Sequence, residues 1–328
     1  MLASHLDKKY DTPEMDKQPS RNGYGEGLVE AAKRDTRIVA LAADLTESTR
    51  TLPFAEAFPD RFVQVGITEQ SMASVASGMA AMGKVPFIAS YAMFSPGRNW
   101  EQIRTTIAYN QSNVKIIGAH AGVSVGPDGA THQAIEDMAL MRVIPNMVVI
   151  APADVHEARK ATLAAAKYEG PVYIRVGRSN TPIVTTAESP FEIGKAVVMY
   201  ERTEALSADV AIVVTGTLLF NALKAAQALE ARGIGTMVLH MPTVKPLDRE
   251  ALLRVAREYK GMVTVEEHQR VGGLGGAVAE YLSEVHPTKI RRVGVDDVFG
   301  QSGEPDELVE HYGMGVEGIV RAAELVQG

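Results

Sequence analysis

The sequence predicts an α/β protein made of two doubly wound domains in series. Short apolar runs of β-forming residues alternate with helical patterns along most of the chain, which is typical of a parallel sheet covered by helices on both faces. A stretch containing proline and threonine interrupts this alternation at residues 179–190. The length of 328 residues also exceeds what a single hydrophobic core usually organises, so two domains are expected.

The first domain is expected over residues 21–180, after a polar N-terminal arm at residues 1–20 that carries two prolines. Its strand-like segments are Arg37–Ala42, Phe62–Gly66, Pro86–Tyr91, Val114–His120, Met147–Ala151 and Val172–Val176. Its helical segments are Tyr24–Lys33, Glu69–Met82, Asn99–Asn110, Gln133–Met141 and Asp154–Tyr168.

A linker at residues 181–192 is expected to lead into the second domain, residues 193–328. The strand-like segments there are Val210–Thr215, Gly235–His240, Met262–Glu266 and Ile290–Val295. The helical segments are Leu218–Ala231, Asp248–Tyr259, Leu274–Val285 and a last helix near Val316–Val326.

The composition is that of a folded globular protein and argues against several classes of function. Hydrophobic residues make up 46% and charged residues 22% of the chain, and the formal net charge is −7. With no basic stripe, the sequence gives no indication of nucleic-acid binding. The absence of cysteine excludes disulfides, thiolate metal sites and a cysteine nucleophile. No signal peptide or membrane span is visible, so we expect a cytoplasmic protein without a membrane partner.

Polar side chains follow the predicted strands, where ligands bind in open parallel sheets. Residues of this kind are Asp44, Ser48, Glu69, Tyr91, Phe94, His120, Asp128, His132 and Arg178. Glu69 begins a helix rich in Ser, Ala and Gly, which could press the carboxylate against another backbone and keep its proton available at neutral pH. The alternative is an ordinary first-turn glutamate that complements the helix dipole.

The segment Gly118–Gln133 has four glycines, one aspartate and two histidines, with neither a helical nor a strand period. Its backbone must turn tightly while carrying titratable groups. A demanding loop of this content is more often a site than a connector.

At this point the sequence resembles the thiamine-diphosphate-dependent transketolase family, from about Arg21 onward. The segments that carry the resemblance are Ala-Asp-Leu-Thr-Glu-Ser (43–48), Gly-Ile-Thr-Glu-Gln (66–70), Gly-Pro-Asp-Gly-Ala-Thr-His-Gln (126–133), Ile-Pro-Asn-Met-Val-Val-Ile-Ala-Pro-Ala-Asp (144–154) and Ile-Arg-Val-Gly-Arg (174–178). The resemblance implies a pyrimidine-binding domain followed by a transketolase C-terminal domain. The family's diphosphate-binding domain, with its metal motif, has no match in this chain.

The resemblance implies roles in cofactor binding for four residues. Glu69 resembles the glutamate that bonds a ring nitrogen of the aminopyrimidine and so allows the thiazolium ylide to form. Phe94 and Tyr91 resemble the aromatic pocket that stacks on the pyrimidine, although plain core packing remains open for Tyr91. Asp44 would lie near the thiazolium, with an N-cap-like structural role as its alternative.

Substrate roles follow from the same resemblance. His120, Arg178, Ser48 and Arg21 resemble a sugar-phosphate clamp, in which guanidinium groups bind the dianion. Asp128 resembles the residue that reads a donor hydroxyl. His132 resembles one near the reacting carbonyl, and its alternative is a histidine that caps the helix expected after Gln133.

Other polar groups receive structural interpretations. Arg175 is expected to be an ion-pair partner, and the glycines of Val271–Gly276 lack the spacing of a dinucleotide loop. Glu266 and Glu267 are adjacent on a strand and should face opposite sides, so we assign no metal ion to this chain.

The implied activity is transfer of a two-carbon ketol unit from a ketose phosphate to an aldose phosphate, through a thiamine ylide and a carbanion-enamine. A separate N-terminal subunit would supply the diphosphate site and a divalent cation, Mg²⁺ or Ca²⁺. Two copies of each chain would form a heterotetramer, with the helix Ser71–Gly83 near its two-fold axis. The alternatives are a deoxyxylulose-phosphate synthase-like or 2-oxoacid dehydrogenase beta-like subunit, and a non-catalytic relative. His120 and the intact set of site residues argue against them.

Overall fold

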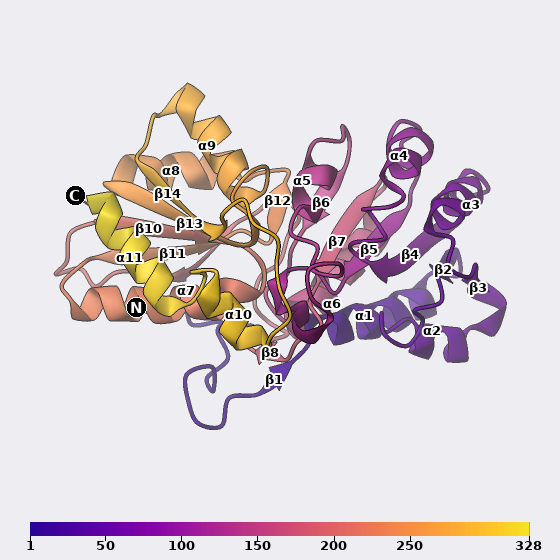
Figure 1. Ribbon diagram of the computed structural model, residues 1–328, viewed down its shortest axis with the longest axis horizontal. Coiled ribbons are helices and arrows are strands. Elements are labelled where there is room, and N and C mark those ends of the chain that lie inside the picture. The colour runs from indigo at the N-terminus through magenta and orange to yellow at the C-terminus, as the bar shows by residue number, and fades with distance from the viewer. Residues whose placement is uncertain (328) are drawn as a thin grey trace.

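The computed structural model describes residues 1–327 and contains two α/β sheets that lie next to each other (Figure 1). The fold class expected from the sequence is confirmed. The first sheet has the strand order β12-β6-β7-β5-β4-β2-β3, in which only β12 is antiparallel to its neighbour. Its strands are β2 (Ile38–Ala42), β3 (Phe62–Gln64), β4 (Val85–Tyr91), β5 (Lys115–Ala119), β6 (Val148–Ile150), β7 (Val172–Val176) and β12 (Thr243–Lys245).

Helices cover both faces of this sheet because its strands are buried on both sides. One face packs against α1 (Ser20–Arg34), α2 (Leu52–Ala57) and α6 (Val155–Lys167). The other packs against α3 (Glu69–Ala81), α4 (Trp100–Gln102) with the π-helix η2 (Ile103–Ala108), and α5 (Asp137–Arg142). Short 3-10 turns lie at η1 (Pro59–Arg61) and η3 (Val123–Asp128).

The second sheet has the order β14-β13-β10-β11-β9, with only β9 antiparallel. Its strands are β9 (Val197–Tyr200), β10 (Val210–Val214), β11 (Thr236–His240), β13 (Gly261–Gln269) and β14 (Ile290–Val295). The surrounding helices are α7 (Leu219–Ala231), α8 (Arg249–Glu258), α9 (Leu274–Val285), α10 (Pro305–His311) and α11 (Val316–Gln327), with the short η4 at Gly216–Leu218. One hydrophobic cluster runs from the first sheet into the second, which joins the two domains through a shared core.

The N-terminal segment, expected as a polar arm, packs against the second domain (Figure 1). Leu6 and Tyr10 are buried there, and β1 (Lys17–Gln18) pairs with β8 (Thr181–Pro182) from the expected linker. Main-chain hydrogen bonds from Ala3 to Met199 and from Asp7 to Val184 also hold this segment in place.

Most predicted elements are found with small shifts at their ends, and two helices differ more. The helix expected over Gln133–Met141 starts only at Asp137, because Ala134 and Ile135 accept main-chain hydrogen bonds from Gly122 and Gln269. The helix expected over Asn99–Asn110 becomes the short α4 followed by η2. Thr105 and Thr106 hydroxyls there donate to carbonyls four residues back, a contact that disturbs regular helices.

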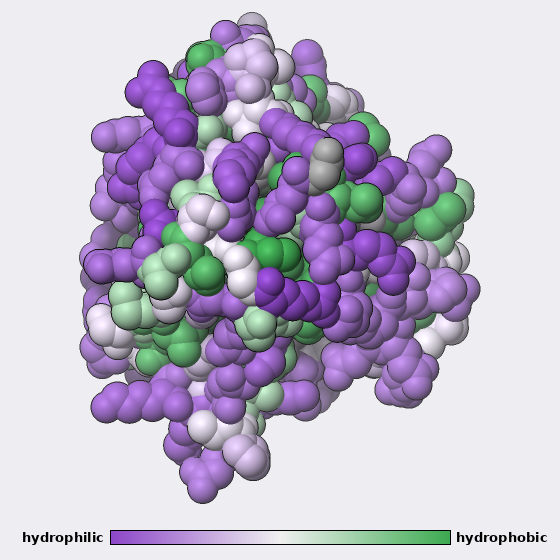
Figure 2. Space-filling model, turned by 90° about the vertical axis from the view of Figure 1, so that its left-hand side faces the viewer, coloured by the Kyte–Doolittle hydropathy of each residue, from purple (hydrophilic) through white to green (hydrophobic). Residues whose placement is uncertain are grey.

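The exposed end of the second domain is mostly hydrophilic, with small separate hydrophobic areas (Figure 2). Single large apolar side chains are exposed in both domains. Ile67, Met82 and Tyr109 in the first are exposed by 71%, 83% and 84%, and Val271 and Phe299 in the second by 69% and 84%. Among the helices of residues 1–327, none combines the length and the apolar character needed to cross a membrane.

Candidate active site

The predicted site residues gather where the strand order of the first sheet reverses. The chain passes from β2 to β3 on one side and returns to β4 on the other side of β2. Ligands bind in open α/β sheets beyond the carboxyl ends of the strands at such a reversal. Asp44 follows β2, Glu69 begins α3 after β3, and Tyr91 ends β4.

Glu69 is buried, with 1% of its surface exposed. Ser90 Oγ donates a hydrogen bond to Oε1 at 3.0 Å, and Arg98 Nη1 donates to Oε2 at 2.9 Å. Asn99 Nδ2 donates to the main-chain oxygen of Glu69 at 3.0 Å. The carboxylate is thus fixed by side chains of β4 and the following loop, unlike an exposed glutamate that only complements a helix dipole.

Sequence reasoning misses both side chains that hold this carboxylate. Arg98 also lies over the Phe94 ring, with Cζ 4.8 Å from the ring centroid, so the cation links the aromatic ring to Glu69. Ser90 and Arg98 lie close in sequence to the predicted site residues Tyr91 and Phe94. This proximity is the one feature of the sequence that could have pointed to them. Their separations of 21 and 29 residues from Glu69 match no local period, so only the folded chain reveals the contacts.

An aromatic group lies beside the carboxylate. The rings of Tyr91 and Phe94 stack with centroids 6.0 Å apart and an interplanar angle of 16°. His120 lies 4.0 Å from Tyr91 between ring centroids, and His132 meets both aromatic rings edge-on at 6.2 and 5.6 Å. Tyr91 and Phe94 are both half-buried, so plain core packing does not describe Tyr91.

A second group joins α1 to the loop after β2. Arg21 Nη1 donates to the carbonyl of Ser48 and to His120 Nε2, both at 2.7 Å. Because a guanidinium only donates, Nε2 accepts and the ring proton sits on Nδ1. Two buried nitrogens in this group, Arg21 Nε and His120 Nδ1, have no protein partner within residues 1–327. Both are N–H donors, which suits an anionic ligand.

Burial and the surrounding charges keep His120 neutral. Burial, followed by the Arg21 and Arg178 charges, lowers the pKa of His120 to about 3. Burial and the nearby Arg50 and Arg178 charges also lower the pKa of Arg21. Arg50 was outside the predicted set and adopts a left-handed backbone with φ of 64°. Three guanidiniums near one neutral histidine make this part of the site electropositive.

The loop between β5 and α5 places the remaining substrate candidates. Arg178 Nη1 pairs with Asp128 Oδ2 at 2.8 Å and also donates to the carbonyl of Val125 at 3.3 Å. His132 Nδ1 lies 2.9 Å from Thr131 Oγ1. The helix-capping alternative for His132 is wrong, because α5 starts at Asp137.

Asp44 and Arg175 have hydrogen-bond partners outside these groups. Asp44 is exposed, has φ of 60°, and uses its main-chain N–H to bond Gln64 Oε1 at 2.8 Å. It begins no helix, so the N-cap alternative is wrong for it. Arg175 is buried and pairs with Asp137 at 2.9 Å, which confirms the structural ion pair.

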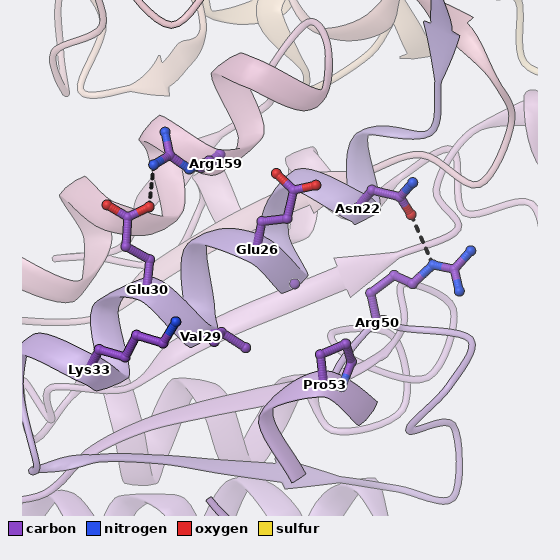
Figure 3. A pocket seen from close by; sticks show the side chains of 9 residues that line it. Asn22, Glu26, Val29, Glu30, Lys33, Arg50, Pro53 and Arg159 are labelled. Carbon is purple, nitrogen blue, oxygen red and sulfur yellow. Dashed lines mark hydrogen bonds and ion pairs between the residues drawn. The ribbon is translucent and has the colours of Figure 1, made fainter. Parts of the chain in front are cut away.

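A groove of about 540 Å³ lies behind the arginine group, between α1, α2 and α6 (Figure 3). Asn22 and Arg50 face each other at one end, where Arg50 Nε donates to Asn22 Oδ1 at 2.9 Å. Glu30 and Arg159 form an ion pair on the other side. None of the predicted site residues lines this groove, which separates it from the strand ends.

The residues present fit the pyrimidine half of thiamine diphosphate. A buried carboxylate next to a half-buried aromatic pair offers a hydrogen-bonding partner and a stacking surface to a flat heteroaromatic ring. The orphaned donors Arg21 Nε and His120 Nδ1 fit an anionic substrate group instead. Within residues 1–327, no three His, Asp or Glu side chains gather in a way that would hold a metal ion.

Comparison with known proteins identifies the two domains. Residues 16–184 match the transketolase pyrimidine-binding domain, and residues 200–319 match the transketolase C-terminal domain. A putative transketolase C-terminal section from Methanocaldococcus jannaschii is 44% identical over 304 residues, covering 92% of this chain and 94% of that protein. A 6-deoxy-6-sulfo-D-fructose transketolase subunit from Clostridium sp. is 41% identical over 303 residues, covering 92% of each chain.

Among solved structures, a split-gene transketolase described as an inactive beta4 tetramer superimposes with a TM-score of 0.87. It is 47% identical and covers 94% of this chain and 98% of that one. The transketolase family depends on thiamine diphosphate, in agreement with the carboxylate and aromatic groups above. The chain therefore belongs to the transketolase family, as the counterpart of its split-type C-terminal subunits.

Proposed function

We propose that the protein transfers a two-carbon ketol unit from a ketose phosphate to an aldose phosphate, a reaction of the pentose phosphate type. It would act together with a separate subunit that carries the diphosphate-binding domain. The observation that carries the proposal is the convergence of a buried carboxylate, a stacked aromatic pair and an arginine group at one strand reversal. A non-catalytic relative would have no need to keep all three.

The first two groups are suited to the cofactor. Thiamine diphosphate, when bound, supplies the carbon nucleophile and the electron sink that ketol transfer requires. Glu69 would hold and move the proton at the pyrimidine ring nitrogen, while Tyr91 and Phe94 hold the ring. Ser90 and Arg98 keep the carboxylate in place, so the proton transfer needs no rearrangement of Glu69.

The third group is suited to the substrate. Arg21, Arg178 and the main chain at Ser48 surround neutral His120, whose buried Nδ1–H has no acceptor within residues 1–327 and would donate to a phosphate oxygen. Asp128 and His132 lie on the loop that borders this group, where a sugar hydroxyl and the reacting carbonyl would come. The relatives named for sulfofructose and apulose-4-phosphate transketolases act on other anionic sugars, so the arginine group rather than one sugar skeleton supports the proposal.

The partner subunit would bring the diphosphate site with its divalent cation, giving a heterotetramer with two copies of each chain. A self-association surface on α3 supports this arrangement. Ser71, Ser74 and Gly78 are exposed, Val75 is 41% exposed, and Met82 just beyond the helix is 83% exposed. Small residues beside exposed apolar ones allow two helices to approach closely. The similar structure is a tetramer of one subunit and is inactive, which agrees with a need for the partner.

The direct test is ketol transfer by the purified two-subunit complex, with xylulose 5-phosphate as donor and ribose 5-phosphate as acceptor. Replacing Glu69 by Gln should lower turnover by about 100-fold to 10,000-fold, because the carboxylate no longer exchanges a proton. Size-exclusion chromatography should show that the Glu69→Gln complex still assembles. Phosphorylated donors should be used far better than their unphosphorylated counterparts.

Glu56→Gln is the matched control, because Glu56 is exposed on α2 and, within residues 1–327, makes no side-chain hydrogen bond or ion pair with the three groups. It should retain full turnover. An assembled, cofactor-loaded complex without ketol transfer would overturn the proposed reaction. Near-normal turnover in Glu69→Gln would remove Glu69 from the chemistry.

A further inference from the structure

The loop that carries Asp128 and His132 is held by the other domain. We define the sugar loop as residues 122–132. Its anchor is the adjacent Gln133, which is only 2% exposed. The Gln133 side-chain nitrogen donates to the carbonyls of Val123 at 3.0 Å and Gly126 at 3.3 Å, inside the sugar loop. The same nitrogen donates to the carbonyl of Gln301 at 2.9 Å, in the second domain.

The orientation of this amide is fixed by chemistry. Three carbonyl oxygens surround the nitrogen, so a flipped amide would bring its own oxygen against all three. The Gln133 oxygen instead faces Gly300, where an added Cβ would come within 1.8 Å of it. A glycine at 300 therefore allows the second domain to approach the amide this closely.

Glu267 makes a second contact of the same kind. This residue, in β13 of the second domain, is 4% exposed. Its Oε1 accepts the main-chain N–H of Ser124 at 2.7 Å, and its Oε2 accepts the hydroxyl of Thr217 at 3.1 Å. A Cβ on Gly122, which has φ of 88°, would come within 2.2 Å of this carboxylate.

The rest of the sugar loop is equally close to the second domain. A Cβ added to Gly129 would lie 2.7 Å from Ser302 Oγ, and one added to Gly126 would lie 3.1 Å from the carbonyl of Gly303. Figure 1 shows α10 and the segment leading to it at the boundary of the two sheets, beside the first domain. One face of the loop therefore rests on residues 300–305.

We propose that the C-terminal domain positions the sugar loop for catalysis, and that Gln133 is the positioning residue through which it does so. The inference rests on the proposed function, because it assigns the loop's Asp128 and His132 to the sugar. Glycines at 122, 126 and 129 all have positive φ, so the loop has little conformational preference of its own. Contacts from outside the loop must therefore select its catalytic conformation. The side-chain amide of Gln133 makes such contacts, because it bonds the loop and the second domain together.

The test uses Gln133→Leu in the assembled two-subunit complex loaded with thiamine diphosphate. Leucine keeps the bulk of the side chain and removes all three hydrogen bonds. Because a misplacement of about 1 Å can cost up to about 100-fold, we expect kcat/KM for the ketose phosphate to fall roughly 10-fold to 100-fold. The dissociation constant of thiamine diphosphate should change less than about 2-fold, since the proposal assigns Asp128 and His132 to the sugar and the carboxylate of Glu69 is held outside this loop.

Hydrogen–deuterium exchange of the same complex supplies a readout independent of turnover. Amides of residues 123–129 should exchange at least about 10-fold faster in Gln133→Leu, while the strands β4 and β5 keep their protection. The matched control is Gln269→Leu. Gln269 bonds the main chain of Asp297 and Val298 in the same segment but makes no side-chain bond to the sugar loop within the described residues. It should leave exchange and kcat/KM unchanged.

Gly300→Ala tests the contact from the other domain. Its added methyl group would displace the Gln133 amide, so it should reproduce both effects of Gln133→Leu. The proposal is overturned if either variant leaves exchange of residues 123–129 at the wild-type rate, or if kcat/KM matches that of Gln269→Leu. If the wild-type complex lacks ketol transfer, the proposed function fails, while the exchange experiment still decides whether Gln133 orders the loop.

Discussion

At the scale of single residues, His120 shows how surroundings change the role of a side chain. A histidine in a phosphate clamp could bind as a cation. Here burial and the charges of Arg21 and Arg178 lower its pKa to about 3, so it acts as a neutral acceptor for Arg21 and a neutral donor at Nδ1. The arginines supply the positive charge of the site, whereas the neutral histidine supplies an N–H donor with a fixed orientation.

This neutrality has a consequence for stability in acid. The pKa of His120 is lower in the folded state than the 6.5 of an ordinary histidine, so the unfolded chain binds the proton first. Stability is therefore complete above pH 6.5 and is lost as the pH falls from 6.5 towards 3. Between pH 7 and pH 5 the loss from this group reaches up to about 2 kcal/mol.

Replacing His120 by Gln should remove that part of the acid sensitivity. Urea unfolding at pH 7 and pH 5, without sugar phosphate, measures the free energy of unfolding for both proteins. His311→Gln, at an exposed histidine, is the control and should behave like the wild type. If the free energy of unfolding of His120→Gln falls between pH 7 and pH 5 as much as that of the wild type, His120 does not cause this part of the acid sensitivity.

At the scale of elements, the packing of α1 on α6 determines where Arg21 lies. Helix α1 contains glycines at 23, 25 and 27, which weaken helices in isolation. The structure gives their reason: a Cβ at Gly23 would come within 1.9 Å of the carbonyl of Val155, and one at Gly27 within 2.8 Å of Thr162 Cβ. The two helices touch backbone to backbone, and this fixes the start of α1.

Gly23→Ala should therefore force the helices apart and destabilise the protein by about 1–3 kcal/mol. Affinity of the two-subunit complex for phosphorylated sugars should fall as well, because Arg21 lies two residues away on the same turn. Thermal unfolding and KM for the donor measure the two effects. Gly276→Ala in α9 is the control: its Cβ would meet Arg142 Nη2 at 3.4 Å, ordinary contact, so stability should hold or rise slightly. A fully stable Gly23→Ala protein would contradict the close packing.

Several short elements are missed by sequence reasoning. Helices α2 and α10 and strands β9 and β12 contain between three and seven residues. Such lengths cover too few turns or alternations for a hydrophobic period to emerge. By contrast, β7, β14 and α9 are found at their predicted bounds, because each shows a clear pattern between turn residues.

At the scale of the whole molecule, buried polar pairs join the two domains. Glu157 on α6 and His240 on β11 are both buried, and His240 Nε2 lies 2.8 Å from Glu157 Oε2. The same carboxylate oxygen accepts the main-chain N–H of Ala153 at 2.7 Å. Removing one partner of such a pair leaves an uncompensated buried charge.

His240→Ala should lower the free energy of unfolding by about 3–5 kcal/mol and weaken the coupling between domains. The single tryptophan, Trp100, lies in the first domain, so its fluorescence reports that domain while circular dichroism reports both. In the variant the two urea transitions should separate, whereas they should coincide in the wild type. Glu157→Gln keeps the shape and hydrogen-bonding capacity and should cost less. If the two transitions of His240→Ala coincide at the wild-type midpoint, the Glu157–His240 pair does not couple the domains.

The sequence by itself determined the fold class and the family, and it predicts which residues form the site. Alternating strand and helix patterns predict parallel sheets, and parallel sheets bring strand ends together, so Glu69, Tyr91 and His120 can be placed at one edge. The transketolase-like motifs then supply the role that we propose for each residue. The fold could be predicted because it depends on periodicity and on order along the chain.

Only the tertiary structure decided which groups hold the site in place. Ser90 and Arg98 fix Glu69, Gln133 joins the sugar loop to the second domain, and Arg50 adds a third guanidinium. The Gln133–Gln301 contact spans 168 residues of sequence. Contacts of this kind leave no periodic signal, because they depend on how two separately patterned domains meet. Local sequence motifs therefore indicate which residue types form the site, whereas the contacts that position these residues depend on the whole fold.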